Sequence, residues 1–92
     1  MESKVYLLTI FCHCKAIDYY EYLRTVRDKN SDIIERFESV FHGANYWFEE
    51  HLHILVQFKA PVSVEEITFR FDVQKESIQS VKSFDSTLEC LK

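Results

Sequence analysis

The chain has 92 residues, enough for one small domain with its own hydrophobic core and too few for two, so we treat residues 1–92 as a single domain. Apolar residues make up 47% of the chain and charged residues 28%, and a single Gly and a single Pro exclude linker-like and collagen-like sequences. Fifteen acidic and eleven basic residues give a net charge of -4, which excludes nucleic-acid binding through bulk positive charge. Any contact with DNA must therefore be local.

The first half of the chain predicts a strand, a helix and a second strand. Residues 4–12 are continuously apolar and rich in β-branched and aromatic side chains, as in a strand at the centre of a sheet. Residues 17–29 have a helical spacing of apolar side chains and end at Asn30, the apolar positions being Tyr19, Leu23 and Val26. Residues 36–42 alternate imperfectly before a turn signal that begins at Gly43.

The clearest strand covers residues 51–59. One face of this strand is apolar, consisting of Leu52, Ile54, Val56 and Phe58, and the other carries His51, His53, Leu55, Gln57 and Lys59. Pro61 is expected to stop it. The sequence therefore predicts one face packed on the core and a second, mostly polar face.

After Pro61, the sequence predicts a helix, a strand and a last helix. Ser63 and Glu66 have the spacing of a capping box before a short helix that runs to about Phe71. Residues 77–82 alternate weakly, as in a short strand. Asp85 or Ser86 then caps the last helix.

This β-α-β-β-α-β order with a final helix predicts an α+β fold of the ferredoxin-like, split βαβ type. Its central antiparallel sheet has two helices on one face, and the other face is open or half covered. The first and third strands are central in this arrangement. The polar face of His51 and His53 is therefore expected in the middle of the sheet.

Two histidines separated by one residue on a strand project from the same face with Cβ atoms roughly 6–7 Å apart. His51 and His53 therefore suit two ligands of one metal ion, although a pair of solvent-facing histidines is the alternative. Glu49 and Glu50 supply carboxylates directly before the pair. Two or three imidazoles with a carboxylate suit Mn²⁺ or Mg²⁺ bound to a phosphate, with zinc as an alternative.

The third ligand depends on how the second and third strands are paired. A tight turn at Gly43 would place Glu38 and Ser39 opposite the end of the third strand, whereas a loop over residues 43–50 would place His42 beside His51. We favour the longer loop, because it lets the polar segment after Gly43 arch over the edge of the sheet.

Three motifs resemble a known family: Leu7-Leu8-Thr9, His51-Leu52-His53, and the segment from Ile78 to Lys92. Their order and spacing resemble the N-terminal HUH endonuclease domain of the replication initiators of circular single-stranded DNA viruses, such as geminiviruses, nanoviruses and circoviruses. The resemblance covers nearly the whole chain. It implies the same fold and a role in rolling-circle DNA replication.

The resemblance also implies roles for individual residues. The first motif, with Leu8 and Thr9, would contact DNA, and His51 and His53 would bind the divalent metal. The nucleophilic tyrosine of the family falls on Cys90, and its lysine falls one residue beyond Lys92, the nearest substitute. The glutamate usual on the second strand meets Gly43 or Ala44, so His42, Glu49 or Glu50 would have to replace it.

The nucleophile position has the largest consequence for activity. A cysteine side chain is several ångströms shorter than tyrosine, and a free thiol has a pKa near 8.5, so attack on a phosphate is expected to be impaired. The tyrosines of the first helix are alternative nucleophiles, although their helical spacing is more typical of core and rim residues; they are Tyr19, Tyr20 and Tyr22.

Other motifs are weaker. Cys12-His13-Cys14 lacks the two-residue spacer of a zinc knuckle and has no second pair. The aromatic run around Trp47 either plugs the edge of the sheet or stacks on single-stranded bases. Arg70, between two phenylalanines, and Lys82 are further candidates for DNA contact.

The sequence therefore predicts a domain that binds single-stranded DNA of an origin stem-loop and nicks it with Mn²⁺ or Mg²⁺ through a covalent 5′-phosphate link, with reduced activity because of Cys90. The first alternative is a ferredoxin-like module that binds nucleic acid without cleaving it. The second is a protein-interaction domain with incidental histidines.

The context of the domain is also an expectation. The three cysteines cannot form a closed disulfide set, and we find no basic leader and no apolar run of roughly 20 residues. We therefore expect a reducing compartment, the host cytoplasm or nucleus, and no membrane. A helicase domain in a longer parent protein, or a homo-oligomer, is compatible with this prediction.

Overall fold

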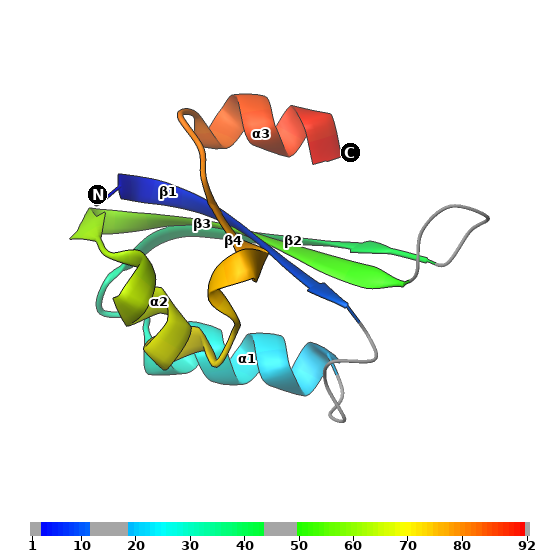
Figure 1. The fold of residues 1–92 in the computed structure, drawn as a ribbon, viewed down its shortest axis with the longest axis horizontal. Coiled ribbons are helices and arrows are strands. Elements are labelled where there is room, and N and C mark those ends of the chain that lie inside the picture. Colours follow the sequence, from blue (N-terminus) through cyan, green and yellow to red (C-terminus); the bar gives the residue numbers. More distant parts are fainter. Residues whose placement is uncertain (1–2, 12–18, 44–49, 92) are drawn as a thin grey trace.

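A computed structural model describes residues 3–11, 19–43 and 50–91, which form a four-stranded sheet and several helices (Figure 1). The elements in chain order are β1 (Ser3–Phe11), α1 (Tyr19–Lys29), β2 (Ile34–His42), β3 (His51–Val62), α2 (Val64–Phe71), the 3-10 helix η2 (Lys75–Ser77), β4 (Ile78–Ser80) and α3 (Phe84–Leu91). The strand order is β2-β3-β1-β4, and neighbouring strands are antiparallel. This is the ferredoxin-like α+β arrangement that the sequence predicts.

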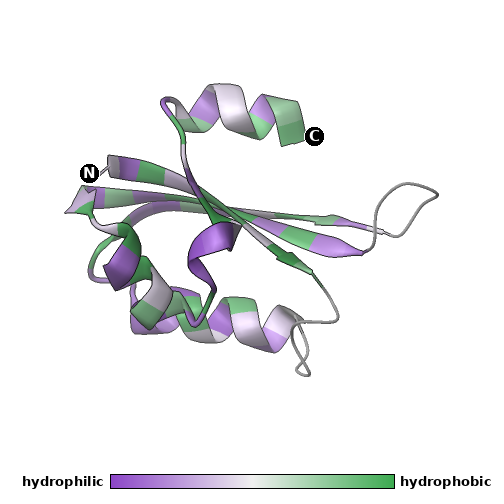
Figure 2. Ribbon diagram, in the orientation of Figure 1, coloured by the Kyte–Doolittle hydropathy of each residue, from purple (hydrophilic) through white to green (hydrophobic). Residues whose placement is uncertain are grey.

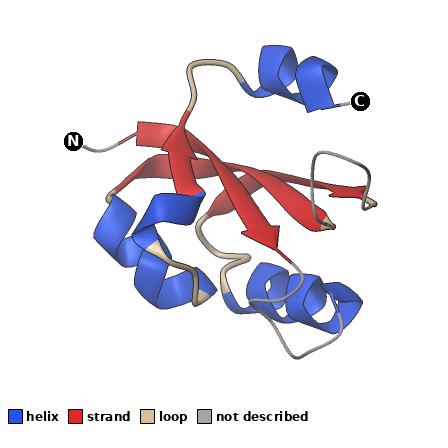
Figure 3. Cartoon of the chain, turned by 45° about the vertical axis from the view of Figure 1, so that its right-hand side comes forward, coloured by secondary structure: helices blue, strands red, loops and turns tan. Residues whose placement is uncertain are grey.

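Helices α1 and α2 cover one face of the sheet, and α3 lies over the other (Figures 1 and 3). The core fills the space between the sheet and α1 and α2, and it is built mainly from alternate residues of the two central strands. Apolar and polar residues alternate along the strands in Figure 2. The buried core residues are Tyr6, Leu8, Ile10, Tyr22, Val26, Leu52, Ile54, Val56, Phe58, Val62, Ile67, Phe71 and Val73.

The second face of the sheet is half covered, because α3 contacts β3 on that side. Leu55 lies on the same face as His51 and His53 and is fully buried. The buried ring of Phe84 anchors the start of α3, and the Arg36 guanidinium of β2 lies 4.0 Å from its centroid. Arg36 also pairs with Asp85 at 2.9 Å. These contacts fix α3 above the sheet.

Several element boundaries differ from the sequence-based prediction. β2 begins at Ile34, two residues early, and β4 is only three residues long because η2 occupies the segment before it. Pro61 does not stop β3, which continues to Val62. A proline is tolerated here because it lies near the strand end, where the pairing of β3 with β1 is irregular.

The starts of two helices confirm one predicted cap and correct another. Ser63 caps α2, since its hydroxyl accepts a hydrogen bond from the Glu66 amide at 3.2 Å, as the capping box predicts. The last helix is not capped by Asp85 or Ser86. The Ser83 hydroxyl accepts a hydrogen bond from the Ser86 amide at 3.2 Å, and Asp85 is turned to Arg36 instead.

The buried side of α1 is centred on Tyr22 and Val26, with Leu23 partly buried at its margin. The predicted face placed Tyr19 in this role, but the side chain of Tyr19 lies outside the described residues. The Tyr22 hydroxyl donates a hydrogen bond to the Phe71 carbonyl, which ties α1 to the end of α2. Within the described residues, no helix is both long and apolar enough to cross a membrane.

Candidate functional site

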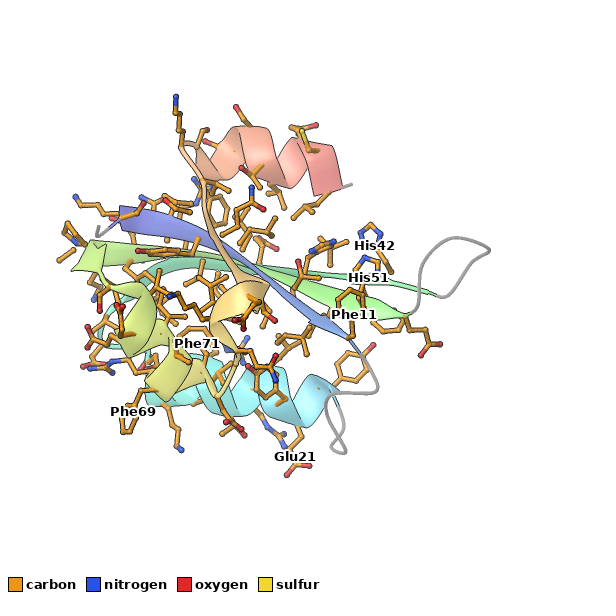
Figure 4. The ribbon with its side chains drawn as sticks, viewed as in Figure 1. Phe11, Glu21, His42, His51, Phe69 and Phe71 are labelled. Atoms are coloured by element: carbon orange, nitrogen blue, oxygen red, sulfur yellow. The ribbon has the colours of Figure 1, made fainter. Side chains whose placement is uncertain are left out.

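Three histidine side chains gather at one end of the sheet, on the side of α3. Strand pairing places His42 of β2 directly opposite His51 of β3, which is the register predicted for the longer loop. His51 and His53 share this face because side chains alternate along a strand. The ring centroids are 5.0 Å apart for His42 and His51, 5.0 Å for His42 and His53, and 4.8 Å for His51 and His53. Figure 4 shows His42 and His51 side by side, with Phe11 next to them.

The histidines line an open cavity of about 420 Å³ between the end of the sheet and the end of α3. The other described lining residues are Thr9 and Phe11 of β1 and Cys90 and Leu91 of α3. Thr9 Oγ1 lies 3.1 Å from His53 Nδ1, a hydrogen bond that fixes the orientation of this ring. The Phe11 ring centroid lies 5.6 Å from that of His51 and forms an apolar wall of the cavity.

The environment of the cavity favours a neutral His53. Burial, and after it the neighbouring His51 and His42, lower the pKa of His53 from its ordinary 6.5 to about 4. His53 is therefore uncharged at neutral pH, so one of its nitrogens keeps a lone pair. His42 Nε2 is buried and has no hydrogen-bond partner in the described part of the chain. Buried polar groups in folded proteins are normally paired with protein atoms or ordered water, so this nitrogen has room for a water molecule or a ligand atom.

Imidazoles gathered in a small space suit a divalent metal ion chemically. Three imidazoles that bind one ion at ordinary metal–nitrogen lengths have centroids about 5 Å apart. The observed spacing matches this value, but the rings pack against one another, and the planes of His42 and His51 are only 21° apart. No group of three or more His, Cys, Asp or Glu side chains in residues 3–11, 19–43 and 50–91 is already arranged to hold a metal ion. Binding would require the rings to turn about their side-chain bonds.

The structure brings some of the predicted site residues together. One cavity is lined by five predicted site residues that come from distant parts of the sequence: Thr9, His42, His51, His53 and Cys90. Cys90 is a free, exposed thiol. Glu50 is exposed and is not among the described lining residues of the cavity. The predictions for Trp47, Glu49 and Lys92 lie outside the described residues, as does the Cys12-His13-Cys14 motif.

Leu8 and Arg70, two of the predicted DNA-contact residues, lie away from the cavity. Leu8 is fully buried beneath α1 and α2, so its side chain is not accessible to a DNA strand. Arg70 lies on α2, across the sheet from the histidines, where its guanidinium donates hydrogen bonds to Asn30 and Glu66. Its described contacts are structural.

Lys82 is exposed between β4 and α3 and does not line the cavity. The sequence analysis missed Phe11 and Leu91 as lining residues. Phe11 follows Thr9 by two positions and so shares its face, a signal that was present in the sequence.

Comparisons with known proteins do not place this cavity in a family: no family model matches the chain, and no curated protein and no solved structure matches it.

Proposed function

We propose that this chain is a metal-dependent domain of a rolling-circle replication initiator that binds origin single-stranded DNA at the histidine cavity. The observation that carries the proposal is the convergence of His51, His53 and His42 with Cys90 around one opening. The resembled HUH domains pair a two-histidine metal site with an attacking residue on the last helix. In this chain, residues at the corresponding motif positions meet at one cavity.

The residues of the chain have separable roles in this proposal. The imidazoles would hold Mn²⁺, Mg²⁺ or another divalent ion, and that ion would supply positive charge to a scissile phosphate and to the leaving 3′-oxygen. Thr9 orients the His53 ring, and Phe11 and Leu91 exclude water from one side of the opening. Cys90 occupies the nucleophile position with a short side chain, so the chain binds and positions DNA better than it cuts it.

The alternative proposal is a nucleic-acid-binding module without nuclease activity. The cysteine in place of tyrosine favours it, because a domain that only binds DNA needs no nucleophile. The two proposals share the cavity, the metal and the single-stranded DNA partner. They differ only in whether a covalent product forms.

Binding is tested with a fluorescent stem-loop oligonucleotide and the chain stripped of metal by a chelator. Adding Mn²⁺ should raise the affinity of the chain for the oligonucleotide. In the double variant H51A/H53A, the increase in affinity that Mn²⁺ causes should be smaller by about tenfold or more. Gln57→Ala is the matched control, since Gln57 lies further along the same face of β3 and pairs with Glu35 outside the cavity. Binding that ignores both metal and histidines would contradict the proposal.

A further inference from the structure

The strand β2 forms one edge of the sheet. The strand order leaves it with β3 as its neighbour, and no other strand of the described residues pairs with it. Along its outer side, a strand of nine residues presents a row of backbone amide and carbonyl groups. Proline and lysine often protect such an edge from further pairing, and β2 contains neither. The irregularity in its pairing with β3 lies at its start, between Ile34 and Arg36, so the rest of the edge can accept another strand.

Most charged side chains of β2 are turned to their own molecule. Glu35 accepts a hydrogen bond from Gln57 at 2.7 Å, and Arg36 pairs with Asp85 at 2.9 Å. Glu38 is exposed, has no ion pair within the described residues, and lies on the α3 side of the sheet, opposite Leu55. An added strand would therefore meet one negative charge on that side.

An open cavity of about 370 Å³, the edge groove, lies between β2 and α1. Strand β2 contributes its residues 37–39 to the groove. Phe37 and Leu23 are partly buried against the core and give the groove an apolar floor. The remaining described lining comes from the exposed side of α1 and consists of Tyr20, Arg24 and Arg27.

The side of the edge groove formed by α1 is positively charged. Arg24 and Arg27 are exposed and lie one helical turn apart, so they share one side of α1. Arg24 has no ion pair within the described residues, and Arg27 lies 3.8 Å from Asp28 in an exposed contact that water weakens. A guanidinium group binds a carboxylate through two parallel hydrogen bonds. The groove therefore suits an acidic side chain beside the strand edge.

The same charges disfavour a second copy of this chain as the occupant. If β2 paired with β2 of a second copy around a two-fold axis near residues 37–39, both α1 helices would lie on one face of the joined sheet. Arg24 and Arg27 of the two copies would then face one another, and like charges across an interface are unfavourable. A single DNA strand is also a poor fit to the edge, because it lacks the alternating amide and carbonyl groups of a peptide.

We propose that the outer edge of β2, with Arg24 and Arg27, is a docking site for an extended, acidic peptide segment of another protein. The segment adds to the sheet as a further strand, and its acidic side chains lie over the edge groove. Because side chains alternate along a strand, the residues between them face Glu38 and are neutral or basic. This inference does not depend on the histidine cavity or on the proposed function.

The test uses a fluorescent peptide of valine and threonine, as long as β2, with glutamate at two alternate positions and blocked ends. The unchanged chain should bind it more tightly than the same peptide with glutamine in place of glutamate. The variant R24E/R27E should weaken binding of the glutamate peptide about tenfold or more. The matched control K75E/K82E makes the same change of net charge at exposed positions outside the edge groove and should leave the affinity unchanged.

A reversal of charge on both partners separates lost contacts from a lost fold. R24E/R27E should bind a third peptide, with lysine in place of glutamate, more tightly than the unchanged chain does. If the variant binds neither peptide while its urea midpoint equals that of the unchanged chain, the arginines do not select the charge of the segment, and the proposal fails.

Methylation of peptide amides tests the backbone pairing. Alternate amides of an added strand point to β2 and to solvent, so methyl groups on one alternate set should abolish binding and those on the other set should preserve it. Equal effects of the two sets would overturn strand addition. A dimer of the chain in sedimentation that excludes the peptide would assign the edge to a second copy instead. Stem-loop DNA that loses affinity in R24E/R27E, with no peptide bound by the unchanged chain, would assign the arginines to DNA and also overturn the proposal.

Discussion

His53 lies on a central strand in contact with two other imidazoles, at a place where a positive charge is unfavourable. Burial there and the neighbouring His51 and His42 lower its pKa to about 4. Because protons compete with metal ions for imidazole nitrogen, the low pKa keeps the ring open to metal through the whole neutral range. The same arrangement makes the fold sensitive to acid.

The pKa of His53 predicts the direction in which the stability of the fold changes with pH. Between the ordinary pKa of 6.5 and the folded value of about 4, the unfolded chain binds a proton at His53 that the folded chain does not bind. The free energy of unfolding of the metal-free chain should therefore fall as the pH drops through this window. His53→Asn keeps a hydrogen-bond acceptor near Thr9 and cannot be protonated. The free energy of unfolding of this variant should therefore depend less steeply on pH.

Urea denaturation in the presence of a chelator, repeated at several pH values, measures this slope. Thr25→Ala, a substitution at an exposed position of α1, serves as the control and should keep the full slope. Equal slopes for the unchanged chain and His53→Asn would show that another group causes the acid sensitivity.

Two neighbouring residues of β3 provide a second test, because both side chains are buried although they lie on opposite faces of the sheet. Ile54 is buried under α1 and α2, and Leu55, on the opposite face, is equally buried beside α3. Ile54→Ala and Leu55→Ala should each lower the free energy of unfolding by about 2–5 kcal/mol. Gln57→Ala should cost no more than about 1 kcal/mol, because its hydrogen bond to Glu35 is exposed. Urea midpoints measure all three, and a tolerated Leu55→Ala would contradict the packing of α3.

The end of α1 is joined to α2 by a buried amide. Asn30 is nearly fully buried, its Nδ2 donates to the Val26 carbonyl at 2.7 Å, and its Oδ1 accepts from Arg70 at 3.1 Å. Asn30→Leu would leave the carbonyl and the guanidinium without these partners. We expect a loss of about 1–3 kcal/mol in the free energy of unfolding, measured by urea denaturation. Ser31→Ala, at the exposed neighbouring position, should cost much less, and a similar loss in both variants would contradict this role.

The described contacts that hold helix α3 come from β2 and β3. Phe84 supplies buried apolar area, whereas the exposed Arg36–Asp85 pair is screened by water and contributes little to stability. Phe84→Ala should therefore release α3, lowering the hydrogen-exchange protection of its amides about tenfold or more while α1 amides change less. Asp85→Asn should have a small effect. Equal loss of protection in α1 and α3 would indicate global unfolding instead.

These contacts also explain what the sequence could and could not predict. The alternation of β3 and the helical spacing of α1 are local patterns, and they predicted the order of the elements and the face of His51 and His53. The docking of α3 joins Arg36 to residues almost fifty positions later, so no local pattern indicates it. For the same reason, the buried state of Leu55 and the contacts of Arg70 appeared only in three dimensions. The sequence left two pairings of β2 with β3 open, and the observed register is the one that places His42 opposite His51.

The whole molecule has an excess of acidic residues, so under the proposed function its attraction to a DNA strand would have to come from the cavity rather than from the rest of the surface. Four elements meet at the cavity, namely β1, β2, β3 and α3. A metal at the imidazoles would supply local positive charge. Under the proposed function, chemistry on a bound strand would depend on the residue that α3 presents at position 90, which is Cys90.

Cys90→Tyr tests that dependence. A phenol reaches several ångströms further than a thiol, so its oxygen can bond to the phosphorus while the 3′-hydroxyl leaves with a proton. The unchanged chain should bind the stem-loop strand without a covalent product, whereas Cys90→Tyr should form an adduct that survives a denaturing gel. Cys90→Phe is the matched control, because it carries the same ring without the nucleophilic oxygen. The adduct should also disappear in Cys90→Tyr combined with H51A/H53A, and an equal yield from the unchanged chain or from Cys90→Phe would place the nucleophile elsewhere.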